Sequence, residues 1–110
     1  MSRTVLKGAV CTFVLALLGS GIAHAGDPMK GKEKSTVCAA CHGADGNSAS
    51  SAFPRIAGQY EDYLFRALLD YKAGKRKNPI MAAQVENLGK GDLADLAAWF
   101  SSQEGLVFKR

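Results

Sequence analysis

The chain has 110 residues, of which 47% are hydrophobic and 22% are charged, and its formal net charge is +4. This length allows one small domain, and so modest a positive charge does not support a nucleic-acid-binding protein, which would need a concentrated basic surface. The chain has only three cysteines and two histidines, so the position of each can be considered separately.

The first 25 residues have the three parts of a secretory signal peptide. The start of the chain is basic, residues 9–18 are apolar, and Ala23-His24-Ala25 provides the small residues that flank a cleavage site. The apolar run is about half of the roughly 20 residues that a membrane-spanning helix needs. We therefore expect cleavage and no membrane span in the mature protein, the alternative being an uncleaved helix at a membrane surface.

Cleavage after Ala25 would leave one domain, residues 26–110, in the periplasm, which is an oxidising compartment. It removes one cysteine, one histidine and two basic residues, so the net charge falls to +2. A domain of this size often needs a cofactor or a cross-link to be stable. Cys38 and Cys41, the two cysteines that remain, are the candidates to provide one.

We predict an all-α domain with three main helices. The first begins at Asp27-Pro28, where an N-cap residue precedes a proline, and runs toward Cys38. The second covers about residues 59–73, where apolar and aromatic side chains recur at steps of three and four residues, and Gly74 ends it.

The third helix is predicted to begin at Asp92, with Asp95 three residues later and apolar residues on one face. No segment alternates for long enough to indicate a strand, which leaves long loops at 43–58 and 75–91. Loops of this length in a short chain usually have a function or wrap around a ligand. We also expect the tyrosines of the second helix to pack in the core: Tyr60, Tyr63 and Tyr71.

The motif CAACHG, residues 38–43, brings together two thiols and an imidazole. Structural zinc needs four ligands, and the mature chain has no other Cys or His. A thioredoxin-like redox pair needs a preceding strand in a βαβ context, which is not indicated. The motif C-x-x-C-H is also the attachment signature of c-type haem. We favour haem, because Cys38 and Cys41 lie on one face of a helical turn and His42 follows them, where its imidazole can bind the iron.

The presence of a second axial ligand distinguishes an electron-transfer haem protein from one that binds ligands. An iron with two protein ligands tends to move electrons. Met29 lies about 20 Å from His42 if both are on one helix with a rise of about 1.5 Å per residue, so it cannot reach the opposite face of the haem. Met81 lies in the long loop and can reach it, although a methionine more often fills a gap in a core. We expect Met81 to bind the iron, to raise its reduction potential and to leave no open position.

These residues resemble the small bacterial class I cytochromes c, most closely the single-haem cytochromes c553 and either half of the dihaem cytochromes c4. The resemblance covers about residues 27–103, through CAACHGADGNS, FPRIAGQYEDYL, NPIMAAQVENL and DLADLAAWF. It implies a small cytochrome c fold of helices and long loops around one covalent haem c. In this resemblance Cys38 and Cys41 are the attachment sites, and His42 and Met81 are the axial ligands of the iron.

The resemblance also implies two supporting contacts. The carbonyl of Pro54 would accept a hydrogen bond from the proximal histidine and orient its imidazole. Gly31 in the first helix would cross the last helix against an aromatic side chain, either Trp99 or Phe100.

We therefore predict a diffusible periplasmic electron carrier of a respiratory chain, not an enzyme. Its expected partners are redox proteins, with a membrane oxidoreductase as donor and an oxidase or reductase as acceptor. Two alternatives stay open: a haem protein whose sixth position binds a gas or reduces peroxide, and an electron-entry subunit of a dehydrogenase. A basic run at the end of the second helix is the candidate docking surface, although cations there also complement the helix dipole: Lys72, Lys75, Arg76 and Lys77.

Overall fold

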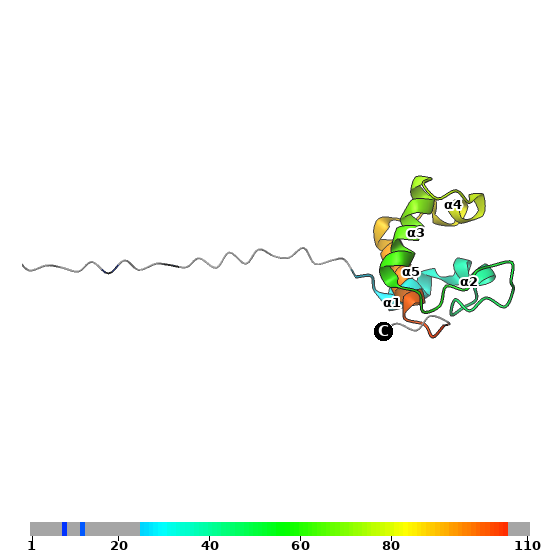
Figure 1. Cartoon of the computed structure of the whole chain (residues 1–110), viewed down its shortest axis with the longest axis horizontal. Coiled ribbons are helices and arrows are strands. Elements are labelled where there is room, and N and C mark those ends of the chain that lie inside the picture. The colour runs from blue at the N-terminus through cyan, green and yellow to red at the C-terminus, as the bar shows by residue number, and fades with distance from the viewer. Residues whose placement is uncertain (1–7, 9–11, 13–24, 106–110) are drawn as a thin grey trace, which may run out of the picture.

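The computed structural model describes residues 8, 12 and 25–105 of the chain (Figure 1). Apart from residues 8, 12 and 25, the expected signal peptide lies outside the described residues. The described part is built of helices and loops without strands, which confirms the all-α class: α1 (Pro28–Lys34), α2 (Thr36–His42), α3 (Glu61–Ala73), α4 (Pro79–Val85) and α5 (Lys90–Ser101). Within that part, no helix has the length and apolar character needed to cross a membrane.

The first predicted helix is interrupted and forms two short helices, α1 and α2. The Asp27 carboxylate caps α1 as expected, accepting hydrogen bonds from the backbone of Met29 at 2.9 Å and of Lys30 at 3.3 Å. The break comes at Ser35, whose hydroxyl and backbone N–H both donate to the carbonyl of Lys32, at 2.7 and 3.2 Å. A serine that takes a backbone carbonyl in this way competes with the regular helix hydrogen bonds. Met29 and His42 consequently lie on different helices.

Helix α3 ends where the sequence predicts. Gly74 adopts a left-handed conformation with φ of 75°, and its N–H donates to the carbonyls of Asp70 and Tyr71. Glycine adopts this conformation at little cost, which makes it a common helix terminator.

The predicted loop at 75–91 contains a helix that the sequence analysis missed. Helix α4 begins with Asn78-Pro79, an N-cap followed by proline, which is the same signal as Asp27-Pro28. Helix α5 begins at Lys90 rather than at Asp92. The Asp92 carboxylate accepts a hydrogen bond from the Gly89 N–H at 2.9 Å, so Asp92 occupies the third position of the helix rather than its cap.

Helix α5 provides the centre of the core. Leu93, Leu96 and Phe100 are at most 4% exposed, and Leu64 of α3 packs in the same cluster as Leu96 and Phe100. Much of the apolar surface that stabilises the fold is therefore buried along α5.

Helix α1 crosses α5 at Gly31. A Cβ atom on this residue would collide with the carbonyl oxygen of Asp95 and would lie 2.8 Å from the Cβ of Trp99. The aromatic residue at the crossing is therefore Trp99, and Phe100 packs in the core instead. An ion-pair cluster joins the same helices, because the Lys34 ammonium lies 2.7 Å from Asp92 and 2.6 Å from Asp95.

Candidate haem site

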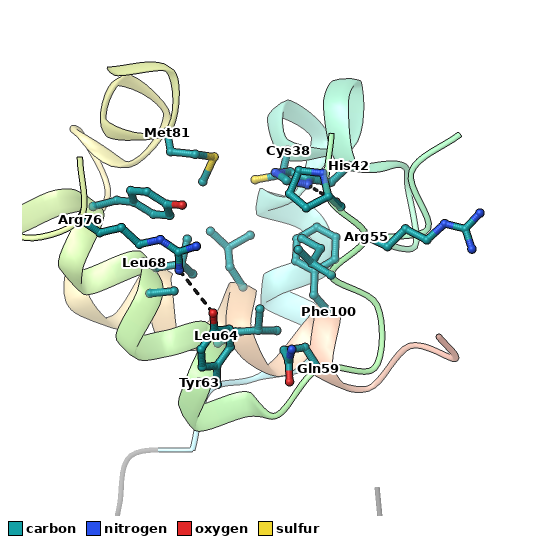
Figure 2. A pocket seen from close by; sticks show the side chains of 16 residues that line it. Cys38, His42, Arg55, Gln59, Tyr63, Leu64, Leu68, Arg76, Met81 and Phe100 are labelled. Carbon is teal, nitrogen blue, oxygen red and sulfur yellow. Dashed lines mark hydrogen bonds between the residues drawn. The ribbon is translucent and has the colours of Figure 1, made fainter. Parts of the chain in front are cut away.

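A cavity with mainly apolar walls opens between α2, α3, α4 and α5 (Figure 2). About 850 Å³ of empty space lies between its walls and in its open mouth. Leu64 and Leu68 of α3, Phe100 of α5 and Ile56 of the loop before α3 form much of the apolar surface. Such walls suit a flat, largely apolar ligand.

Both cysteines of the motif lie on α2, three residues apart, and both are half-buried. Cys38 lines the cavity, whereas Cys41 is not among the residues that line it. Burial raises the pKa of the Cys38 thiol above its ordinary value, and a backbone hydrogen bond partly opposes this shift. The predicted attachment residues thus lie about one helical turn apart on α2, with Cys38 at the cavity wall.

The imidazole of His42 is buried, and its orientation is set by a backbone carbonyl. Its Nδ1–H donates to the carbonyl of Pro54 at 2.8 Å, which joins α2 to the loop at 43–58. With the proton held on Nδ1, the lone pair of Nε2 is available to bind a metal. Pro54 therefore provides the contact that the resemblance implied.

Met81 enters the same cavity from the opposite side. Figure 2 shows its sulfur pointing across the space toward Cys38 and His42. It sits in the first turn of α4, where its N–H donates to the Asn78 side chain at 3.2 Å. The tertiary structure thus brings together four of the five residues that the sequence analysis named, which are Cys38, His42, Pro54 and Met81.

Arg76 and Tyr63 form a polar pair at the cavity wall, which the sequence analysis did not predict. The guanidinium of Arg76 donates to the Tyr63 hydroxyl at 3.5 Å and lies 4.9 Å from the centre of the Tyr71 ring. Sequence reasoning assigned Arg76 to a docking surface and Tyr63 to the core, but Tyr63 is 51% exposed at the cavity mouth. The expectation for Tyr60 is also wrong, because it is 48% exposed. No local pattern relates Tyr63 to Arg76, which are 13 positions apart and meet only because the chain turns back after α3.

The structure gives no support to the zinc alternative. Among the residues that the structure describes, no three His, Cys, Asp or Glu side chains are grouped so that they could hold a metal ion. The described helices and loops also provide no βαβ unit for a thioredoxin-like pair.

The fold and this cavity define a helical, haem-binding domain of the cytochrome type. Residues 28–104 match the Cytochrome c family, and the chain belongs to that family. It is 49% identical over 94 residues to cytochrome c4 of Pseudomonas aeruginosa, an alignment that covers 84% of this chain and 47% of the relative. It is also 39% identical over 83 residues to cytochrome c-554(548) of Halomonas halodenitrificans, covering 73% of this chain and 100% of the relative.

The fold is also that of a solved cytochrome c4. The crystal structure of reduced recombinant cytochrome c4 from Pseudomonas stutzeri superimposes with a TM-score of 0.71 at 47% sequence identity, covering 76% of this chain and 48% of that chain. The chain thus spans about half the length of the cytochromes c4 that it matches. The resemblance to class I cytochromes c is confirmed.

Membership of this family makes covalently bound haem c, with its iron, the cofactor of the chain. The residues present fit this group. The apolar walls match the porphyrin, the imidazole of His42 and the thioether of Met81 face the space from two sides, and Arg76 with Tyr63 offers polar donors at the wall. The chain has a single C-x-x-C-H motif, as expected for one haem.

Proposed function

We propose that this chain is a periplasmic electron-transfer protein with one haem c, held by thioether bonds from Cys38 and Cys41 and by axial bonds from His42 and Met81. The observation that carries the proposal is that Met81 and His42 face each other across one cavity, beside Cys38 (Figure 2). The haem supplies the redox chemistry, since its iron gains and loses one electron between the ferric and ferrous states.

The residues that line the cavity influence the reduction potential of the haem in different ways. The hydrogen bond from His42 to Pro54 fixes the imidazole and makes it a stronger electron donor. The soft, neutral sulfur of Met81 favours the ferrous state and raises the reduction potential. Leu64 and Phe100 exclude water, which disfavours the additional charge of the ferric state.

Whether Met81 binds the iron also decides between an electron carrier and an enzyme. If the sulfur of Met81 binds the iron, no coordination site would remain for a substrate or a gas, and the haem would exchange electrons without binding a substrate at the iron. We infer that the chain is not itself an enzyme, and that its redox partners contact the haem edge.

The Arg76 and Tyr63 side chains are suited to the carboxylates of the haem propionates. A guanidinium presents several N–H donors in a plane that matches a carboxylate, and the tyrosine hydroxyl adds another donor. Both residues line the cavity.

The decisive experiment is the visible absorption spectrum of the protein exported together with the haem-attachment machinery of the host. We expect covalent haem, a low-spin spectrum, the weak far-red band of iron-methionine ligation in the ferric state, and little binding of carbon monoxide. A high-spin spectrum with ready binding of carbon monoxide would instead favour the gas-binding or peroxidase-like alternative. A protein without covalent haem would contradict the proposal.

We propose cleavage after Ala25, so that the mature periplasmic domain comprises residues 26–110. Ala25 is exposed, whereas a Cβ atom at Gly26 would collide with the carbonyl of Ala94, which supports a domain boundary at this point. Mass spectrometry of the periplasmic fraction should give a chain that begins at Gly26. A chain that keeps the first 25 residues would contradict both cleavage and the periplasmic carrier.

We further propose that the donor and acceptor are redox proteins with acidic docking surfaces. A relative from Stutzerimonas stutzeri is named a thiosulfate dehydrogenase electron acceptor, which supports such an exchange with an oxidoreductase. Lys75 and Lys77 are exposed in the loop after α3 and can attract an acidic partner, with rates that fall as salt rises.

The double variant Lys75→Glu with Lys77→Glu tests this docking surface. It should slow bimolecular electron transfer and flatten its salt dependence, whereas Lys90→Glu, at the start of α5, should have a smaller effect. Equal effects of the two changes would contradict the docking surface. Permanent co-purification with a dehydrogenase would favour the subunit alternative over a diffusible carrier.

A further inference from the structure

The helix that carries Met81 is short and little buried. Helix α4 has seven residues, of which Val85 is buried at 2% exposure while Ile80 is 63% exposed. A helix of this length is not stable in water by itself, because forming its first turn is unfavourable. The position of the Met81 sulfur therefore depends strongly on contacts at the two ends of α4.

The start of α4 is fixed by its own cap. The side-chain oxygen of Asn78 accepts hydrogen bonds from the N–H groups of Ile80 at 3.0 Å and of Met81 at 3.2 Å. This cap shapes the first turn, but it lies in the same loop as the helix and does not join it to the rest of the domain.

Besides the buried side chain of Val85, a side chain of α3 contacts the end of α4. The ammonium of Lys72, in the last turn of α3, donates to the carbonyl of Glu86 at 2.9 Å and to that of Val85 at 3.4 Å. Carbonyls at the C-terminal end of a helix lack partners within it, and a cation there also interacts favourably with the helix dipole. This contact spans 13 and 14 positions of the sequence.

We propose that Lys72 is a positioning residue: its ammonium fastens the C-terminal end of α4 to α3 and thereby keeps the Met81 sulfur within reach of the iron. The inference rests on the proposed function, in which Met81 is the sixth ligand. It changes the interpretation of the basic run, because Lys72 acts within the domain while Lys75 and Lys77 extend from the neighbouring loop.

The test uses the mature holoprotein and exogenous imidazole, which binds ferric iron only when the methionine leaves. Lys72→Met should raise the affinity for imidazole about three- to tenfold, the range expected from losing one or two hydrogen bonds. Lys72→Arg should restore the wild-type affinity, because a guanidinium can reach the same carbonyls. Lys75→Met removes the same charge a few residues away and should leave the affinity unchanged.

Amide hydrogen exchange provides a second measurement. In Lys72→Met, the amides of residues 82–85 should exchange faster than in wild type, while the amides in the middle of α5 should not change. If Lys72→Met does not fold, Lys72→Ala, which leaves no side chain that can reach the carbonyls of α4, takes its place.

Failure of this inference is distinguishable from failure of the proposed function. The role of Lys72 would be overturned if Lys72→Met and Lys75→Met had the same affinity for imidazole and the same amide hydrogen exchange, even with the far-red band present. If wild type lacks that band and Met81→Ala binds imidazole no better than wild type, then Met81 is not the ligand, and the proposed function fails together with the inference.

Discussion

The imidazole of His42 and the carbonyl of Pro54 form a hydrogen bond of 2.8 Å across 12 positions of the sequence. This bond joins α2 to the long loop that precedes α3 and fixes which nitrogen of the ring carries the proton. The donor is the side chain of a residue in the C-x-x-C-H motif. The acceptor is a backbone carbonyl, which every residue has and which no residue type identifies.

Loosening this contact should raise the reduction potential. In Pro54→Gly the loop gains conformational freedom, the carbonyl holds the imidazole less firmly, and the weaker electron donation of His42 favours the ferrous state. Loss of a hydrogen bond of about 0.5–1.5 kcal/mol corresponds to an increase of at most about 60 mV for one electron. Protein-film voltammetry measures the shift. A lower potential in Pro54→Gly would contradict this role of the carbonyl.

Removing the sulfur of Met81 should have the opposite and larger effect. Met81→Ala opens the sixth position, so the far-red band should disappear, carbon monoxide should bind, and the potential should fall by more than about 60 mV, which is a tenfold change in the one-electron equilibrium. Met29→Ala is the matched control, because Met29 is 61% exposed on α1. Equal spectra and potentials in the two variants would show that Met81 does not bind the iron.

The crossing of α1 and α5 should tolerate no side chain at position 31. In Gly31→Ala the new methyl group meets the carbonyl of Asp95 and the Cβ of Trp99, so the helices must separate, and we expect a loss of about 1–3 kcal/mol in the free energy of unfolding. Gly91→Ala, in the first turn of α5, meets no atom within 4 Å and should be neutral or slightly stabilising. Urea unfolding of both variants tests this difference, and similar losses would contradict the close packing at Gly31.

The ion pairs of Lys34 should make stability depend on pH in the acid range. Hydrogen bonds from Lys34 lower the pKa of the Asp92 and Asp95 carboxyls below their ordinary values. Because these pKa values are lower in the folded than in the unfolded state, the stabilisation is complete above the ordinary carboxyl value of about 3.9 and is lost as pH falls through the folded values.

Lys34→Met should therefore lower the urea midpoint at pH 7, and its difference from wild type should shrink in acid, where both carboxyls are protonated. Lys77→Met, exposed in the loop after α3, removes one charge without these bonds and serves as the control. A difference for Lys34→Met that stays constant from neutral to acid pH would show that the ion pairs do not contribute.

Several elements of the fold were readable from neighbouring residues. Asp27-Pro28 predicted the start of α1, and Gly74 predicted the end of α3, because caps and terminators act within one helical turn. Asn78-Pro79 has the same pattern of N-cap and proline, and this pattern was sufficient to predict the start of α4. The break at Ser35 was not predictable with the same ease, because a serine inside a helical segment can either point to solvent or bind a carbonyl of the preceding turn.

The sequence by itself determined the cofactor chemistry of this protein, since Cys38, Cys41 and His42 lie within five positions and their relative placement follows from one turn of helix. Only the tertiary structure decided what surrounds them. The chain turns back after α3, and this turn places Met81 across the cavity from His42. It also places Arg76 beside Tyr63, and the end of α4 beside Lys72. Contacts of this kind join distant segments, often through backbone carbonyls that every residue possesses, and therefore leave no local pattern in the sequence.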